Sequence, residues 1–210
     1  MEQKNKTKTG FIIAICGGPG TGKSTLVNKL TEHYHDAIPI FEGEEHDFPE
    51  RIKQNLKDNT NHLEVMIYFR NLLANMHLEA ERLKQAGKFV ITDTFWLTND
   101  VYAEAWLDND FHKDMMRDMS KLDSLFLSMP DLIIILESNK DKVREFMMKR
   151  GRLFEIDDDV IKRYIAAGEA HHDFFKDLPN VVFVNRSQLD FHKSEHFKIV
   201  TDLIDEKLCN

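Results

Sequence analysis

Short runs of apolar residues alternate along this chain with longer amphipathic segments. Continuous apolar runs are typical of strands that are covered on both faces, as in a parallel sheet. Four runs predict such strands, at residues 11–16, 89–92, 132–136 and 181–184. A fifth and weaker run, at residues 38–41, contains Pro39, which predicts an edge strand or a strand start.

Between these runs, apolar residues recur at helical spacing. We expect helices at residues 24–35, 61–85, 139–150, 157–176 and 193–208, and one or two helices within 98–128. Strands that alternate with helices predict a doubly wound α/β domain, in which helices flank a five-stranded parallel sheet in three layers. We expect residues 1–9 to be a flexible leader and residues 10–210 to form one domain.

Composition narrows the class of protein. The chain is 42% hydrophobic and 30% charged, as in an ordinary globular protein, and its net charge of -8 disfavours broad nucleic-acid affinity. No apolar run approaches the length of a bilayer span, so we expect no membrane segment. Cys16 and Cys209 make no disulfide framework, which predicts a reducing, cytoplasmic environment.

The most specific motif follows the first predicted strand. Residues 17–25 read GGPGTGKST, which fits the phosphate-binding pattern G-x-x-x-x-G-K-[ST] between a strand and a helix. Glycines let backbone N–H groups approach phosphate oxygens, Lys23 reaches the terminal phosphates, and the Ser24 hydroxyl suits Mg²⁺. The motif therefore predicts a binding site for ATP and Mg²⁺ made by Gly17, Gly18, Pro19, Gly20, Thr21, Gly22, Lys23, Ser24 and Thr25.

A carboxylate is expected beside this loop on the metal side. The run at 89–92 ends in Asp93, which has the strand-end position of an acid that holds Mg²⁺ directly or through water. The alternative is an ordinary aspartate that caps a turn. We expect Ser24 and Asp93 to be the two metal-side residues.

A nucleotide-binding switch or an ATPase without an acceptor is the alternative from a different class. Asn139-Lys140-Asp141 partly fits the guanine-reading pattern N-K-x-D, but the acid would have to stand at Lys142. A switch would also carry D-x-x-G, whereas residues 93–96 read DTFW. Both patterns fail, so residues 139–141 are better explained as a turn.

A basic cluster favours a kinase instead. Lys149-Arg150-Gly151-Arg152 predicts a small lid, at about residues 149–157, that closes over the phosphates and excludes water. Arginine forks suit γ-phosphate oxygens. The alternative is a basic helix end that complements the helix dipole.

With these motifs, the chain resembles the deoxynucleoside kinase family over most of residues 11–184. The likeness is closest at the phosphate loop and at KRGRLFE, residues 149–155. It implies a P-loop NTPase fold and transfer of the γ-phosphoryl group of ATP to the 5′-hydroxyl of a (deoxy)nucleoside. It also implies that Arg150 and Arg152 contact the phosphates. By the same resemblance Glu42, after the second strand, is the candidate base, with Glu44 and Asp93 as the other candidates.

The chain departs from the family at the acceptor site. Thr94 stands where an arginine usually follows the acid of the third strand, and Met66 falls at or near the base-reading glutamine. Arg70, on the same predicted helix, is then expected to face the pocket. A nucleoside-monophosphate kinase of the thymidylate-kinase type, whose D-R-Y-x-x-S-x-x-A-Y pattern residues 93–103 match in length, and a nicotinamide riboside kinase stay open as alternatives.

Aromatic residues follow Asp93. Phe95, Trp96 and Tyr102 are candidates to contact the acceptor, because a flat ring stacks well on aromatic side chains. Core packing and a homodimer interface are the other interpretations of this segment. Adjacent residues His171 and His172 point to different sides of a helix, so we expect no metal site there.

Overall fold

The centre of the molecule is a parallel sheet of five strands. A computed structural model describes residues 10–43, 45–150 and 158–208, and orders the strands β2-β3-β1-β4-β5. The five strands are β1 (Phe11–Gly17), β2 (Ala37–Ile40), β3 (Phe89–Asp93), β4 (Leu132–Glu137) and β5 (Val181–Asn185). The predicted strands and their parallel arrangement are confirmed, and the strand with Pro39 is indeed an edge strand.

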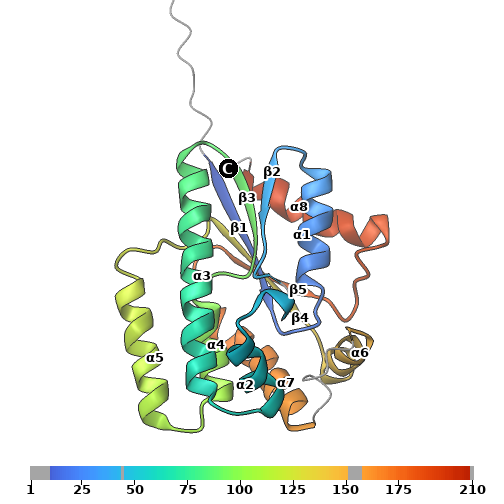
Figure 1. Cartoon of the computed structure of the whole chain (residues 1–210). Helices are drawn as coiled ribbons and strands as arrows, with labels where there is room; N and C mark the ends of the chain where they lie inside the picture. Colours follow the sequence, from blue (N-terminus) through green and yellow to red (C-terminus); the bar gives the residue numbers. More distant parts are fainter. Residues whose placement is uncertain (1–9, 44, 151–157, 209–210) are drawn as a thin grey trace, which may run out of the picture.

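Helices cover both faces of this sheet (Figure 1). They are α1 (Lys23–His33), α2 (Glu50–Asp58), α3 (His62–Gln85), α4 (Thr98–Trp106), α5 (Asp110–Asp123), α6 (Lys140–Arg150), α7 (Asp158–Phe175) and α8 (Ser194–Leu208). A short 3-10 helix, η1 (Glu45–Asp47), precedes α2. Within the described ranges, no helix is long and apolar enough to cross a bilayer.

The central strand β1 explains why a sheet of this kind needs continuous apolar runs. Successive side chains of a strand point to opposite faces. Ile13 and Ile15 pack with side chains of α1 and α8, whereas Ala14 and Cys16 pack with side chains of α3 and α7. All four residues are fully buried, so both faces of β1 are core.

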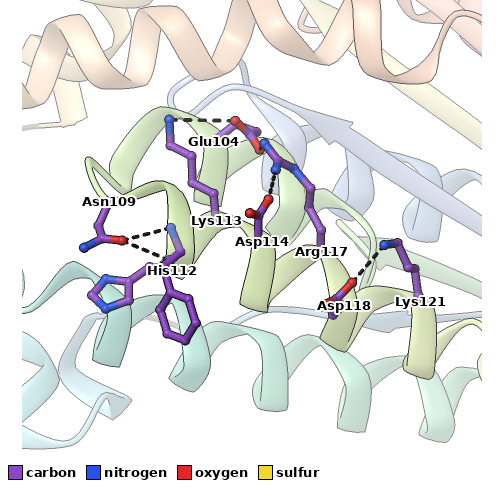
Figure 2. A network of polar contacts seen from close by, with 9 residues as sticks. Glu104, Asn109, His112, Lys113, Asp114, Arg117, Asp118 and Lys121 are labelled. Carbon is purple, nitrogen blue, oxygen red and sulfur yellow. Dashed lines mark hydrogen bonds and ion pairs between the residues drawn. The ribbon is translucent and has the colours of Figure 1, made fainter.

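The segment predicted as one or two helices forms two, α4 and α5. The side-chain oxygen of Asn109 begins α5, because it accepts hydrogen bonds from the backbone nitrogens of Phe111 (2.9 Å) and His112 (3.3 Å) (Figure 2). Glu104 of α4 pairs with Arg117 of α5, and Lys113 adds a longer contact of 3.8 Å. These contacts fasten α5 to α4.

Helix α2 is not predicted by the apolar pattern, because it is short and mostly polar. Pro49 precedes its first turn, and Ile52 and Leu56 are buried one turn apart. The loop from β2 to α3 therefore carries its own helix, which packs against α3.

The carboxyl ends of the strands lie together in the lower part of Figure 1, where α2, α4, α6 and α7 gather. In parallel α/β sheets, ligands bind at this edge. The predicted leader 1–9 and most of the predicted lid, residues 151–157, lie outside the described residues.

Candidate active site

The phosphate loop has the backbone conformation that its glycines allow. Gly17, Gly20 and Gly22 have φ angles of 129°, 73° and 90°, which residues with a side chain rarely adopt. A Cβ atom on Gly17 would also lie 2.4 Å from the carbonyl oxygen of Leu136. The Thr21 hydroxyl donates to the carbonyl oxygen of Gly18 at 2.8 Å, which fixes the turn of the loop.

Two side chains at the start of α1 add an ammonium and a hydroxyl group to this loop. Lys23 folds over it and donates to the carbonyl oxygens of Gly17 (3.2 Å) and Gly18 (3.3 Å). Ser24 donates to Oδ2 of Asp93 at 2.5 Å. The N-terminus of α1 adds its positive dipole end, so backbone, ammonium and hydroxyl groups converge on one small region.

Asp93 ends β3, directly beside β1, and its side chain is buried. Its second oxygen, Oδ1, has no hydrogen-bond partner among the described residues. A buried carboxylate oxygen without a donor suits a hard cation, and Mg²⁺ is commonly held by one carboxylate together with substrate phosphates. Ser24 and Asp93 therefore fit Mg²⁺.

Thr94, directly after Asp93, has an unusual backbone. Its φ angle is 77°, which is rare for a β-branched residue. The Thr94 backbone nitrogen donates to the Ile15 carbonyl oxygen at 2.9 Å, and the hydroxyls of Thr94 and Thr98 lie 2.7 Å apart. These bonds hold the strained residue, and strain of this kind clusters at functional sites. Nothing in the sequence pattern predicted it.

A cavity of about 140 Å³ opens beside the phosphate loop. Its charged lining lies at one end, where Lys23, Ser24, Glu42 and Asp93 contribute. The rest of the wall is mostly apolar or aromatic and comes from α2, α3, α4 and α7 and from Phe48, which precedes α2. This part is lined by Phe48, Leu56, Val65, Met66, Phe69, Leu73, Thr98, Asn99, Tyr102, Trp106 and Tyr164.

Three of the predicted acceptor-side residues line this cavity. Glu42 lies two residues beyond β2 and lines the cavity. Burial raises the pKa of Tyr68, and the nearby carboxylates of Glu42 and Asp47 raise it further. Met66 lines the cavity from α3, and Tyr102 lines it from α4. The Tyr102 hydroxyl also donates to the Gly17 carbonyl oxygen at 3.4 Å, so it touches the phosphate loop.

Three other predicted positions need correction. Arg70 does not line the cavity, because its guanidinium pairs with the buried carboxylate of Asp123 on α5. Phe95 and Trp96 are core residues, 1% and 4% exposed. The indole nitrogen of Trp96 donates to the Ser128 carbonyl oxygen at 3.0 Å, away from the cavity lining.

Sequence reasoning missed Asn99 and Trp106 as lining residues. Both lie on the face of α4 that also presents Tyr102, because positions 99, 102 and 106 share a helix face. Helical spacing from Tyr102 was therefore the signal that could have found them. Phe48 and Tyr164 had no such signal, since the segment before α2 and helix α7 reach the cavity only through the tertiary fold.

The helices on both sides of the predicted lid pack against the phosphate loop. A Cβ on Gly20 would lie 3.1 Å from Cβ of Phe146 in α6, and a Cβ on Gly18 would lie 3.2 Å from Cα of Gly168 in α7. Arg150 ends α6, and its side chain and all of Arg152 lie outside the described part of the chain. The described helices on either side of residues 151–157 thus both lie beside the phosphate loop.

The adjacent histidines His171 and His172 have different surroundings. His171 is buried and its Nδ1 lies 2.6 Å from the Ala167 carbonyl oxygen, while burial lowers its pKa to about 4. The ring is therefore neutral at pH 7. His172 points elsewhere and contacts Glu137 at 2.7 Å. Their different surroundings are consistent with the prediction that they do not share a metal.

Solved structures share this fold. The chain is similar to deoxyadenosine kinase from M. mycoides with products dCMP and a flexible dCDP (TM-score 0.75, 19% identity) and with bound dCTP (TM-score 0.75, 17% identity). It is also similar to that kinase with bound dATP (TM-score 0.74, 15% identity). Each likeness covers 93% of this chain and 99% of the other. The fold implied by the resemblance to deoxynucleoside kinases is therefore confirmed.

A family model matches most of the sequence. Curated proteins include none that matches this chain. Residues 12–168 match the AAA_28 family model, which is described as an AAA domain. These residues contain the phosphate loop, Asp93 and most of the cavity lining, and they make up well over half of the sequence. The protein therefore belongs to this AAA-domain family.

Proposed function

We propose that the protein is an ATP-dependent kinase that transfers the γ-phosphoryl group to the 5′-hydroxyl of a (deoxy)nucleoside. One observation carries the proposal: the phosphate loop and Asp93 form one end of a cavity whose other end is apolar and aromatic. A nucleotide triphosphate on the loop would point its terminal phosphate into that cavity. A flat base with a sugar suits the aromatic end.

The side chains at the junction suit phosphoryl transfer. The 5′-oxygen of the acceptor forms a bond to the γ-phosphorus, the bond from that phosphorus to the bridging oxygen breaks, and ADP leaves with the electron pair. Glu42 accepts the proton of the hydroxyl, while Lys23 and the N-terminus of α1 stabilise the charge on the phosphates. Ser24 and Asp93 would hold Mg²⁺, which supplies neutralisation of phosphate charge.

Glu42 is a better candidate base than Asp93. One oxygen of Asp93 already accepts from Ser24 and the carboxylate lies on the metal side, whereas Glu42 lines the cavity from beyond β2. Glu44, the other candidate, lies outside the described residues. Of the two described candidates, we therefore propose Glu42 as the base.

An unphosphorylated acceptor fits better than a monophosphate. Among the described residues that line the cavity, Lys23 is the sole cation, and it belongs to the phosphate loop. A monophosphate kinase needs a further cation to hold the acceptor phosphate. This observation favours a nucleoside over the thymidylate-kinase alternative, and it leaves nicotinamide riboside as the competing acceptor.

A nucleotide switch has less support. Asn139, the first residue of the partial guanine-reading pattern, accepts from the Lys142 backbone nitrogen at 2.9 Å and so caps α6. Its side chain is therefore used for helix capping. The lined cavity beside the phosphate loop also has no use in a switch without an acceptor.

An acceptor panel tests this function. ADP production is measured with ribonucleosides, deoxynucleosides, monophosphates and nicotinamide riboside, each with MgATP, and products are identified by mass. We expect a nucleoside 5′-monophosphate to form in step with ADP. ADP without a phosphorylated acceptor would contradict the proposal and support an ATPase or switch. If nicotinamide riboside alone is phosphorylated, it takes the place of the nucleoside as the acceptor.

A further inference from the structure

Arg186, directly after β5, packs against the phosphate loop from outside the cavity. A Cβ atom on Gly22 would lie 3.4 Å from Nε and 3.8 Å from Nη2 of Arg186. Gly22 immediately precedes Lys23, the first residue of α1. Arg186 is not among the residues that line the cavity. Its guanidinium therefore lies beside the part of the loop from which α1 begins, where the helix dipole favours an anion.

The guanidinium of Arg186 is held in a fixed position. Its carbon lies 4.6 Å from the ring centroid of Phe191 and 5.1 Å from that of Phe146 on α6. Nη1 donates to the Leu189 carbonyl oxygen, and the backbone nitrogen of Arg186 donates to the Glu137 carbonyl oxygen at 2.7 Å. These contacts fix the charge before any ligand binds, so little conformational entropy is lost on binding.

Arg186 differs from the other arginines because no carboxylate of the described residues pairs with it. The other arginines whose side chains the structure describes each form an ion pair: Arg51, Arg70, Arg82, Arg117, Arg144 and Arg163. Burial lowers the pKa of Arg186, and the charge of Asp190 opposes this without cancelling it. The guanidinium still carries its charge at neutral pH. A half-buried cation without an anion is unfavourable, and a bound anion would relieve this cost.

We propose that Arg186 belongs to the donor site and that its charge stabilises the phosphates of a nucleoside triphosphate on the loop. The inference rests on the part of the proposed function in which the loop binds that triphosphate. A phosphate oxygen bound by the Gly22 N–H group would lie within about 10 Å of Nη2. A fixed charge acts over this distance without direct contact, and partly buried charges are screened less than exposed ones.

The phosphates suit Arg186 better than the base of the donor does. Two aromatic rings already pack near its guanidinium, whereas its charge has no anionic partner among the described residues. A neutral base would add another ring without supplying the missing negative charge. A triphosphate supplies that charge at the place where the loop amides, Lys23 and the N-terminus of α1 already favour it.

Inorganic tripolyphosphate tests the proposal, because it has a chain of three phosphates and no base. The dissociation constants of MgATP and of tripolyphosphate with Mg²⁺ are measured by calorimetry at low and at physiological salt. Arg186→Met removes the charge and keeps an apolar chain against the two rings. We expect both dissociation constants to rise about five- to tenfold in this variant, and their dependence on salt to become weaker.

Three further variants separate the charge of Arg186 from a structural role. Arg186→Gln is neutral but keeps an amide donor for the Leu189 carbonyl oxygen, so it should weaken both ligands as Arg186→Met does. It also keeps the test open if Arg186→Met does not fold. Arg186→Lys keeps the charge without the planar fork and should bind both ligands within about twofold of wild type. Arg82→Met removes the same charge from the end of α3, where Arg82 pairs with Glu79, and should leave both constants unchanged.

Several results would overturn the role of Arg186 while the kinase function stands. One is wild-type affinity of the neutral variants for both ligands. Another is weaker binding of ATP alone, which would assign Arg186 to the base. A third is an equal loss in Arg186→Lys, which would indicate a structural role. If wild-type protein binds neither ATP nor tripolyphosphate, the loop is no phosphate site and both proposals fail together.

Discussion

The two ends of the cavity are built in different ways. Most of the phosphate end comes from one stretch of chain, residues 17–24, whose backbone geometry depends on glycines, and Glu42 and Asp93 add carboxylates from beyond β2 and from β3. The acceptor end comes from side chains on α2, α3, α4 and α7, which are far apart in the sequence. A backbone site of this kind binds any nucleotide phosphate, whereas a side-chain site determines which acceptor enters.

The comparison separates two kinds of functional effect. Changes at the phosphate end should lower the rate with every acceptor, because they act on the group that is transferred. Changes at the acceptor end should alter KM and choice of acceptor while the chemistry continues.

The largest effect is expected from Lys23→Ala. Loss of the ammonium that would face the γ-phosphate in the proposed site should lower kcat by at least about 10³-fold with every acceptor. Circular dichroism and thermal melting should be close to wild type, since the hydrogen bonds that Lys23 donates to described residues go to loop carbonyls. Lys29→Ala, on the same helix and outside the cavity, is the control. Near-normal turnover by Lys23→Ala would show that the phosphate loop has no catalytic role.

The second largest effect is expected from Glu42→Gln. If Glu42 accepts the proton of the hydroxyl, the amide should lower kcat by about 10²-fold or more with a small change in KM. Glu50→Gln, an exposed substitution at the start of α2, provides the matched control. A change in KM alone would pass the role of base to Glu44 or Asp93.

Met66→Ala should act at the acceptor end only. We expect KM for the acceptor to rise by about tenfold as apolar contacts are lost, with kcat and KM for ATP within about twofold of wild type. Met76→Ala is a close control, because Met76 is also buried on α3 but does not line the cavity. Equal kinetic effects in both variants would indicate general damage to α3.

The smallest kinetic effect is expected from Asp100→Asn, on the other side of α4. Burial, together with the nearby carboxylate of Asp123, raises the pKa of Asp100 to about 6, although Ser120 donates to it at 2.7 Å. The folded pKa exceeds the unfolded value, so wild-type stability falls as pH rises from about 4 to 6.

The neutral amide avoids this loss. Asp100→Asn should be more stable than wild type by about 2 kcal/mol at pH 8 and about equal to it at pH 4, with unchanged kcat/KM. Urea unfolding at both pH values measures the difference. A stability difference that is independent of pH would contradict the pKa argument.

The sequence predicts the phosphate end better than the acceptor end, and the physical reason is locality. Strand, loop and helix from Phe11 to His33 are consecutive, so pattern and chemistry coincide there. Asp93 was found because parallel strands end at the same edge. Glu42 was found by resemblance, and its catalytic role stays a prediction.

The acceptor wall depends on how distant helices pack, which one sequence does not reveal. Arg70 was expected in the pocket because its neighbourhood on the helix is otherwise apolar, but Asp123 of α5 provides its counter-charge. Phe95 and Trp96 looked like stacking residues and are core, because the chain turns at Thr94. Trp106, the last residue of α4, can be placed in the cavity wall only when the fold shows where that helix ends.

Binding of a two-substrate analogue tests the central claim most directly. A deoxynucleoside that turns over is joined through its 5′-oxygen to the terminal phosphate of ATP by a short phosphate bridge, and its affinity is measured by calorimetry with Mg²⁺. If the phosphate loop and the cavity form one continuous site, the analogue should bind at least about 10²-fold more tightly than ATP. Affinity no higher than that of ATP would contradict a joint site for donor and acceptor.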